Sequence, residues 1–377
     1  MRHARALGYV LLLLMLVAAP RFLSSYHLSL LGRFLALAIL ALGLVLVWGW
    51  GGVLSLGQGV FFGIGAYVLA MHLKLAALGP GELPDFMQWS GLDHLPWWWS
   101  ILHSTWLTVA AVAIVPGLAA GALAWLVFRR RVGGVYFALL TQALALAFST
   151  LLVSQQPYTG GFNGLTDFST LFGLSLIDPQ FQKRLYWATV ALLALVFVFL
   201  QWLLRSNFGK VLLAIRDGEN RIRFLGYNPV PYKVAAFALG GVFAGMAGAL
   251  FTLNIGVISP AMIGVMPSIE MVVWVAVGGR ASLIGAVAGT LAVNFAKDWI
   301  SSAMPDLWLF AIGALFVLIV MLLPNGLSGI GETIQNVRWR LSRRMAGAKK
   351  GKGLEEAAVC VAVKEGARIT AETPDEA

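Results

Sequence analysis

Uncharged polar residues interrupt an apolar stretch near residue 55, where they could bind a small polar solute. Ser55 and Gln58 lie three residues apart within the glycine-dense segment 51–67. On a helix this spacing places both side chains on one face, and in apolar surroundings each needs a hydrogen-bonding partner. They could bond to each other and to the neighbouring backbone, or they could face a cavity that holds a polar neutral solute.

Two further segments carry polar residues next to apolar runs. Thr159 and Asn163 belong to the glycine-rich segment 157–166, which is either a plain surface turn or a binding loop. Ser268 and Glu270 stand at the start of an apolar run. A carboxylate within a membrane indicates a functional site by default, but one at a helix N-terminus is also stabilised by the helix dipole. Both interpretations of Glu270 stay open.

Residues that would support catalysis form no recognisable pattern. The chain has no GxxxxGK[ST] phosphate loop, so it cannot hydrolyse ATP alone, and it shows no nucleophile–base pairing. The single cysteine, Cys360, excludes an internal disulfide and a cysteine metal cluster, and the five histidines have no metal-ligand spacing. The sequence therefore predicts no catalytic residue, no metal site and no cofactor.

Composition identifies the kind of molecule that must position these residues. Of 377 residues, 59% are hydrophobic and 12% are charged, and the mean hydropathy of +0.82 is far from that of a soluble domain. This excludes a soluble enzyme, a secreted disulfide scaffold and a largely disordered chain. Continuous apolar runs predict an all-α, polytopic integral membrane bundle of about 8–10 transmembrane helices, some short or broken. The runs cover 7–20, 34–50, 59–78, 101–128, 132–153, 185–204, 234–256, 266–279, 283–298 and 307–323.

The net charge of +10 predicts the orientation in the lipid bilayer. Lys and Arg gather at the N-terminus and in 129–131, 205–233 and 338–352. With ten spans these clusters fall on one side, so both termini are expected in the cytoplasm. The charge is then membrane anchoring, and no nucleic acid partner is expected. We interpret the first run as a retained span or signal anchor. Residues 1–330 are expected to form the membrane domain and 331–377 a charged, disordered cytoplasmic tail.

Glycine pairs spaced four residues apart recur within the apolar runs. They predict close helix packing, because a missing side chain lets two backbones approach. Dense glycine also suits broken helices along a solute path. The pairs are Gly59/Gly63, Gly117/Gly121, Gly241/Gly245 and Gly285/Gly289.

Taken in order, these segments resemble the permease subunits of ATP-driven importers for branched-chain amino acids and for urea. The resemblance runs from about Leu37 to Gly329; the N-terminus and the residues after Gly331 match no motif of this family. The matching motifs are GVLSLGQ at 52–58, FFGIGAY at 61–67, TGG at 159–161, AIRD at 214–217 with Gly226, and LPNGL at 323–327. The finer similarity is to the urea-type member, through TGGFNGL at 159–165 and PSIEMVVWVAVGGR at 267–280.

The resemblance implies a multi-pass permease of the bacterial inner membrane that works by alternating access. It implies a second permease subunit in a hetero-oligomer, two cytoplasmic ATP-binding subunits and an extracytoplasmic substrate-binding protein. It also implies that an ATP-binding subunit contacts the charged segment between the apolar runs 185–204 and 234–256. The residues of that contact are Ala214, Ile215, Arg216, Asp217 and Gly226.

The chemistry of the apolar runs bears on the substrate. Because charge is scarce within them, a neutral solute is favoured over an ion or a zwitterion, which agrees with the urea-type resemblance. Urea, which that resemblance implies, is therefore the predicted substrate. A permease for branched-chain amino acids, a self-sufficient channel or ion-coupled carrier, and a non-transporting scaffold remain alternatives. The predicted residues of the translocation path are Ser55, Gln58, Thr159, Asn163, Ser268 and Glu270.

Overall fold

The computed structural model describes residues 16–79, 82–166, 168, 170–171, 174–175, 178–303, 310, 313–314 and 317. Within these residues, eight helices are long and apolar enough to cross a membrane. The predicted all-α polytopic bundle is thereby confirmed. The predicted runs 7–20 and 307–323 lie wholly or mainly outside the described residues, as do the motif at 323–327 and the predicted tail 331–377.

The long helices follow the apolar runs of the sequence. They are α2 (Ser25–Leu44), continued by the π-helix η2 (Val45–Trp50), then α3 (Gln58–Ala76), α6 (Thr105–Arg129), α7 (Val135–Ser154), α9 (Pro179–Arg205), α10 (Asn207–Phe224), α11 (Pro229–Ile255), α12 (Val265–Gly278) and α13 (Leu283–Ala303). The short elements are η1 (Ala19–Arg21), α4 (Asp85–Trp89), α5 (Trp97–Ser100), η3 (Ile101–His103), α8 (Gln156–Thr159), η4 (Gly161–Asn163), β1 (Thr170–Leu171), β2 (Leu174–Ser175) and η5 (Pro260–Met262).

Two of the runs predicted to be short are longer in the structure. The run predicted at 34–50 begins at Ser25, because the helix also includes 25–33, a mixed stretch whose polar residues lower its hydropathy. The run predicted at 283–298 extends through Lys297 to Ala303. In contrast, α12 has 14 residues and is short, as predicted. A full crossing takes about 20 residues, so α12 begins within the bundle.

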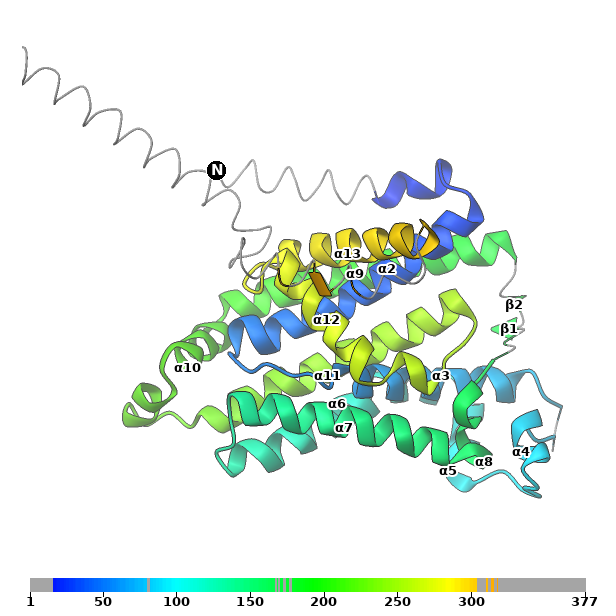
Figure 1. Ribbon diagram of the computed structural model, residues 1–377, viewed down its shortest axis with the longest axis horizontal. Coiled ribbons are helices and arrows are strands. Elements are labelled where there is room, and N and C mark those ends of the chain that lie inside the picture. Colours follow the sequence, from blue (N-terminus) through cyan, green and yellow to red (C-terminus); the bar gives the residue numbers. More distant parts are fainter. Residues whose placement is uncertain are drawn as a thin grey trace, which may run out of the picture. The chain divides into compact units, whose positions relative to one another are not determined.

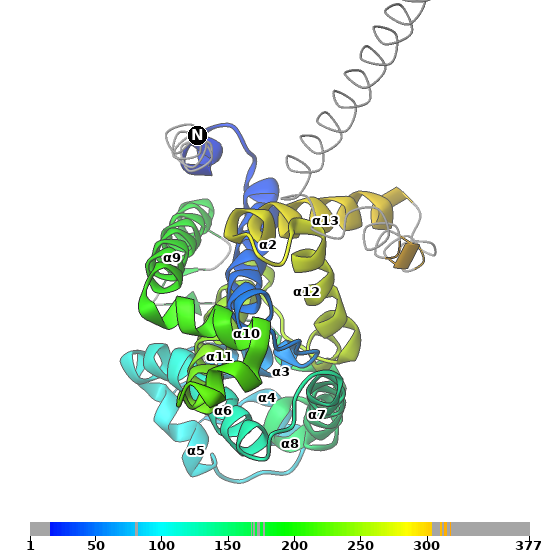
Figure 2. The same cartoon turned by 90° about the vertical axis from the view of Figure 1, so that its left-hand side faces the viewer.

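Helices α2 and α11 form the centre of the bundle (Figure 2). Helix α11 packs against α2, α3 and α6, while α2 also contacts α9, α12 and α13. The predicted glycine packing is confirmed where α11 meets α6: a Cβ added at Gly241 would lie 2.7 Å from the backbone oxygen of Pro116. Helix α7 lies at the edge and keeps most of its apolar side chains exposed, as suits a lipid-facing position.

Two crossings are broken by non-helical backbone. Segment 51–57 is extended and leads from η2 back into the bundle, where α3 begins (Figure 1). Segment 256–264 likewise joins the end of α11 to α12 and contains the single turn η5. Irregular backbone is tolerated at membrane depth only where protein or a water-filled cavity surrounds it. The two breaks are therefore the first places to examine for a solute path.

Candidate functional site

The helices that follow the two breaks, α3 and α12, meet through a serine side chain. Ser268, which is fully buried near the start of α12, accepts a hydrogen bond from the Gly59 N–H of α3 at 3.3 Å. A Cβ at Gly59 would lie only 2.4 Å from the Ile263 backbone oxygen. Ser55 accepts a hydrogen bond from the Gly57 N–H at 3.4 Å. Both hydroxyls therefore satisfy backbone donors at the breaks, where helical partners are missing.

The predicted common helical face of Ser55 and Gln58 is wrong. Helix α3 begins only at Gln58, and Ser55 lies in the extended segment before it. The segment is fixed from outside by Thr141 of α7, whose Oγ1 accepts a hydrogen bond from the Leu56 N–H at 3.0 Å. Spacing along the chain thus gave the wrong geometry because the glycine-rich backbone at 51–57 does not continue the helix.

Gln58 is buried but has no hydrogen-bonding partner for its amide. Its side chain is 2% exposed, and neither Nε2 nor Oε1 has a partner. A Cβ at Gly240 of α11 would lie 3.9 Å from Nε2, so the amide faces the bare backbone of that helix. An unsatisfied buried polar group costs about 1–3 kcal/mol. Such a cost in the centre of the bundle favours a functional role for Gln58.

Replacing Gln58 with leucine should separate packing from function. We expect Gln58→Leu to fold as well as the wild type or better, because it removes two unsatisfied buried atoms. Solute uptake should nevertheless fall clearly. The measurements are the thermal midpoint of the purified chain and uptake in cells, with Gln180→Leu at an exposed position of α9 as the matched control. Unchanged uptake in Gln58→Leu would return Gln58 to a packing role.

A cavity of about 490 Å³ near the breaks is lined by residues of α2, α3, α11, α12, α13 and the segment before α12. Of the six predicted path residues, Glu270 lines it, whereas the other five do not. Glu270 is the sixth residue of α12, beyond the first turn. Its carboxylate accepts hydrogen bonds from Lys297 Nζ of α13 at 2.8 and 3.1 Å. The helix-dipole interpretation is thus insufficient, because a specific cation holds this carboxylate.

The cavity contains more charge than the sequence led us to expect of a solute path. Four charged side chains line it: Arg33 of α2, Glu270 of α12, and Lys297 and Asp298 of α13. Sequence reasoning missed Arg33 and Lys297, which both lie just outside the predicted apolar runs or at their ends. The structure places both cations within membrane-crossing helices, where an ionisable residue usually marks a functional position.

The glycine-rich turn holds the other two predicted path residues away from this cavity. Thr159, at the end of α8, donates a hydrogen bond to the Leu152 backbone oxygen at 2.6 Å. Asn163 ends η4 and is exposed. Backbone hydrogen bonds between Leu165 and Ile258 join this turn to the segment before α12. The predicted compact turn is confirmed by positive φ angles at Gly160, Gly161 and Gly164, and a binding role for Thr159 or Asn163 stays a prediction.

The charged segment between α9 and α11 forms a helix, α10, with a kink at Gly218. Figure 1 shows α10 at the end of the bundle away from the start of α2. Ala214 is half-buried and Ile215 is buried, so the latter is part of the packing surface of α10. Gly226 follows the helix with a φ of +86°. This charged segment is therefore a helix that packs against α9 and α11.

Arg216 points inward to the bundle. Its Nη1 donates a hydrogen bond to the Gly49 backbone oxygen of η2 at 2.7 Å, and its Nε pairs with Asp217 at 2.9 Å. A Cβ at Gly52, where φ is +69°, would lie 2.7 Å from Arg216 Cγ. The side chain thus joins α10 to the end of the π-helix, a type of helix that occurs mostly at functional sites.

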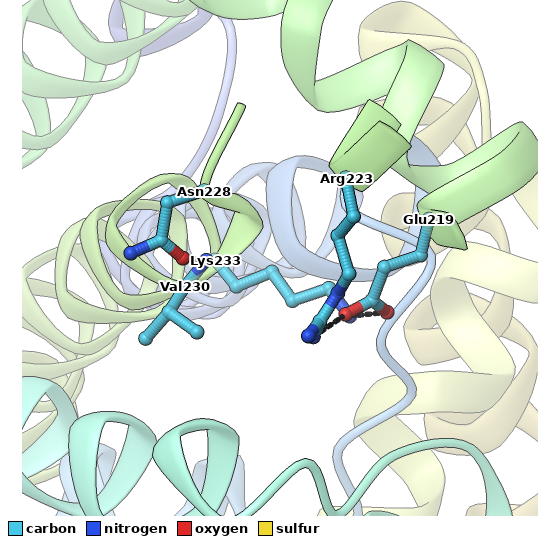
Figure 3. Close-up of polar contacts among 5 residues, drawn as sticks. All are labelled: Glu219, Arg223, Asn228, Val230 and Lys233. Carbon is cyan, nitrogen blue, oxygen red and sulfur yellow. Dashed lines mark hydrogen bonds and ion pairs between the residues drawn. The ribbon is translucent and has the colours of Figure 1, made fainter. Parts of the chain in front are cut away.

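A three-residue ionic cluster fixes the angle between α10 and α11 (Figure 3). Glu219 accepts a hydrogen bond from Arg223 at 2.6 Å and another from Lys233 of α11. Partial burial acts to raise the pKa of Glu219, but the hydrogen bonds and charges of Lys233 and Arg223 outweigh it and hold the pKa below its usual value. Because the folded pKa is lowered, the cluster stabilises the fold at neutral pH and is lost only in acid.

The tip after this cluster presents apolar side chains. Phe224 is 91% exposed, and Leu225 and Tyr227 are also exposed around Gly226. Asn228 then starts α11, since its Oδ1 accepts a hydrogen bond from the Val230 N–H at 3.1 Å. A rigid base under exposed aromatic residues is typical of a protein contact surface. We call residues 224–227 the α10 tip.

Comparison with known proteins gives a consistent result. Residues 26–320 match the family described as "Branched-chain amino acid transport system / permease component". The chain is 27% identical over 340 residues to the high-affinity branched-chain amino acid transport system permease protein LivM of Escherichia coli K12, covering 84% of this chain and 73% of the relative. It is also 27% identical over 314 residues to LivH of Salmonella typhimurium, covering 78% of this chain and 92% of the relative. No solved structure was found to match the chain.

Proposed function

This chain belongs to the family of permease components of branched-chain amino acid transport systems, and we propose that it is the membrane-spanning permease subunit of an ATP-driven importer for branched-chain amino acids. The observation that carries this proposal is the family match over 26–320, which includes both breaks, the cavity and α10. The chain is accordingly a multi-pass inner-membrane protein. That both termini lie in the cytoplasm stays a proposal, supported by the distribution of Lys and Arg.

Branched-chain amino acids replace urea as the leading substrate. The relatives named above are amino acid permeases and give the urea preference no support. The scarcity of charge, on which that preference depended, is also weakened by the Glu270–Lys297 ion pair and by Arg33 at the cavity. An amino acid at neutral pH carries one ammonium and one carboxylate, so opposite charges beside an apolar wall suit it better than they suit urea.

The partners follow from the same family assignment. Similarity to both LivM and LivH supports a second, different permease beside this chain. ATP hydrolysis is assigned to two cytoplasmic subunits that dock on α10 and its tip, and substrate delivery to an extracytoplasmic binding protein. The lack of a phosphate loop in this chain requires such an ATPase. ATP binding would shift the inward–outward equilibrium only through contacts that differ between the two states.

Radiolabelled uptake tests this function. The chain is produced with the products of its neighbouring transport genes in cells that lack leucine uptake. We expect saturable leucine uptake that excess valine or isoleucine inhibits, that excess urea leaves unchanged, and that a phosphate-loop lysine variant of the ATPase abolishes. Urea uptake that leucine cannot inhibit would restore the urea interpretation. Uptake that survives the ATPase variant and stops with an ionophore would favour an ion-coupled carrier.

A further inference from the structure

The cavity contains an arginine for which the described part of the chain supplies no counter-ion. Arg33 lies within the membrane-crossing helix α2 and lines the cavity. Its Nε is buried without an acceptor, and none of the salt bridges among described residues includes it. A cation within a membrane span normally faces a partner or a cavity. Arg33 therefore brings to the cavity a positive charge that no salt bridge among the described residues balances.

A second unpartnered donor lies in the wall of the same cavity. Trp274 of α12 is buried, and its indole Nε1 has no acceptor. Guanidinium and indole groups only donate hydrogen bonds, so a ligand that satisfies them must be an acceptor. A carboxylate matches the planar fork of a guanidinium with two parallel hydrogen bonds.

The opposite charge comes from Glu270. Its side chain is 12% exposed, so it is reached mainly through the cavity that it lines. Lys297 uses both carboxylate oxygens, but a carboxylate has about four acceptor sites. Glu270 can therefore accept from a second ammonium. Asp298 also lines the cavity, yet it is exposed, and water weakens its attraction for a cation.

The remainder of the wall is apolar and adaptable. Phe62 of α3 and Phe251 of α11 meet edge to face at 5.2 Å between ring centroids, and both line the cavity together with Met266 and Met271 of α12. Methionine side chains adjust to irregular aliphatic shapes. A volume of about 490 Å³ lies within the usual range for small-molecule sites.

We propose that this cavity binds the zwitterion of an aliphatic α-amino acid, with Arg33 facing its carboxylate, Glu270 facing its ammonium group and the aromatic and methionine side chains facing its alkyl group. This inference rests on the proposed function and names the site at which the substrate is recognised. Lys297 occupies only part of the acceptor capacity of Glu270, which leaves acceptor sites for the ammonium group. A neutral solute such as urea would leave Arg33 without a counter-ion, so the site discriminates against it.

Two leucine analogues test the two charges separately. The assembled transporter is placed in lipid nanodiscs without its binding protein, and bound radiolabelled leucine is displaced by leucinamide, which keeps only the ammonium, or by 4-methylpentanoate, which keeps only the carboxylate. We expect Glu270→Gln to lower the affinity for leucinamide by at least about tenfold, while the affinity for 4-methylpentanoate changes by less than about twofold. Arg33→Gln should show the opposite pattern. Glu82→Gln, in the exposed connection before α4, is the matched control.

The pattern also separates this site from a purely structural ion pair. Lys297→Gln should retain leucine binding within about threefold, because Glu270 stays available to the ammonium. Equal losses in Lys297→Gln and Glu270→Gln would overturn the proposal, and so would parallel changes for both analogues. Misfolding would lower the affinity for both analogues together, so it cannot produce opposite patterns in the two variants. If the wild type takes up leucine and the variants bind both analogues as the wild type does, the site is refuted but the proposed function is not. If the wild type neither binds nor transports leucine, the proposed function is refuted too.

Discussion

Replacing Gly248 with alanine should prevent α3 and α11 from packing and remove most of the folded protein. A Cβ at Gly248 would lie 2.0 Å from the backbone oxygen of Phe62, and a Cβ at Gly65 would lie 2.2 Å from that of Gly245. The two helices thus touch backbone to backbone, and no side chain can move aside. Forcing them apart is overpacking of a kind that costs about 3 kcal/mol or more. The loss would also displace Phe62 from the cavity and Gln58 from Gly240.

Gly121→Ala is the matched control for this prediction. Gly121 lies within α6, and the nearest atom to an added Cβ is Ala238 Cβ at 3.4 Å, an ordinary contact. Alanine has the higher helix propensity by about 1 kcal/mol, so this variant should be neutral or slightly stabilised. Thermal midpoints and size-exclusion profiles in detergent compare the two variants. A Gly248→Ala protein with the midpoint of Gly121→Ala would contradict the close approach of α3 and α11.

The sequence predicted the features that depend on local patterns. Continuous apolar runs located the eight described spans, because helical hydrogen bonding in lipid requires them. Glycine pairs predicted close packing, since a missing side chain has the same consequence whichever helix approaches. Segment 51–57 lay between two predicted apolar runs, but the prediction that Ser55 and Gln58 share one helical face was wrong, because α3 begins only at Gln58.

The cavity depended on contacts between distant parts of the chain. Nothing local indicates that Lys297 pairs with Glu270 across 27 residues or that Arg33 of α2 lines the same space. Charge scarcity along the sequence was misleading for the same reason: few charged residues are needed to make a polar site when three helices bring them together. Likewise, the inward direction of Arg216 depends on where η2 ends in space, which the charged segment alone does not specify.

Arg216 connects α10 to the first break in the bundle. Its hydrogen bond to the Gly49 oxygen anchors α10 to one side of η2, while Gly49 lies against the Arg280 backbone on the other: a Cβ at Gly49 would be 1.8 Å from the Arg280 oxygen. Segment 51–57 continues from this contact to Gln58. We expect a displacement of α10 to move the backbone that carries Gln58. We therefore propose coupling as the role of Arg216 and docking as the role of the exposed α10 tip.

We expect Arg216→Gln to keep the ATP-binding subunits bound while lowering leucine transport per ATP hydrolysed. A hydrogen bond from a charged donor contributes about 1.5–3 kcal/mol, so its loss should reduce coupling roughly 10- to 100-fold.

Phe224→Ala should instead reduce co-purification of the ATPase, because it truncates the most exposed aromatic residue of the α10 tip. Phe162, 75% exposed in η4, provides the control Phe162→Ala, which should leave co-purification unchanged. If Arg216→Gln loses the ATPase as completely as Phe224→Ala does, Arg216 belongs to the docking surface, and the contact with Gly49 is only structural.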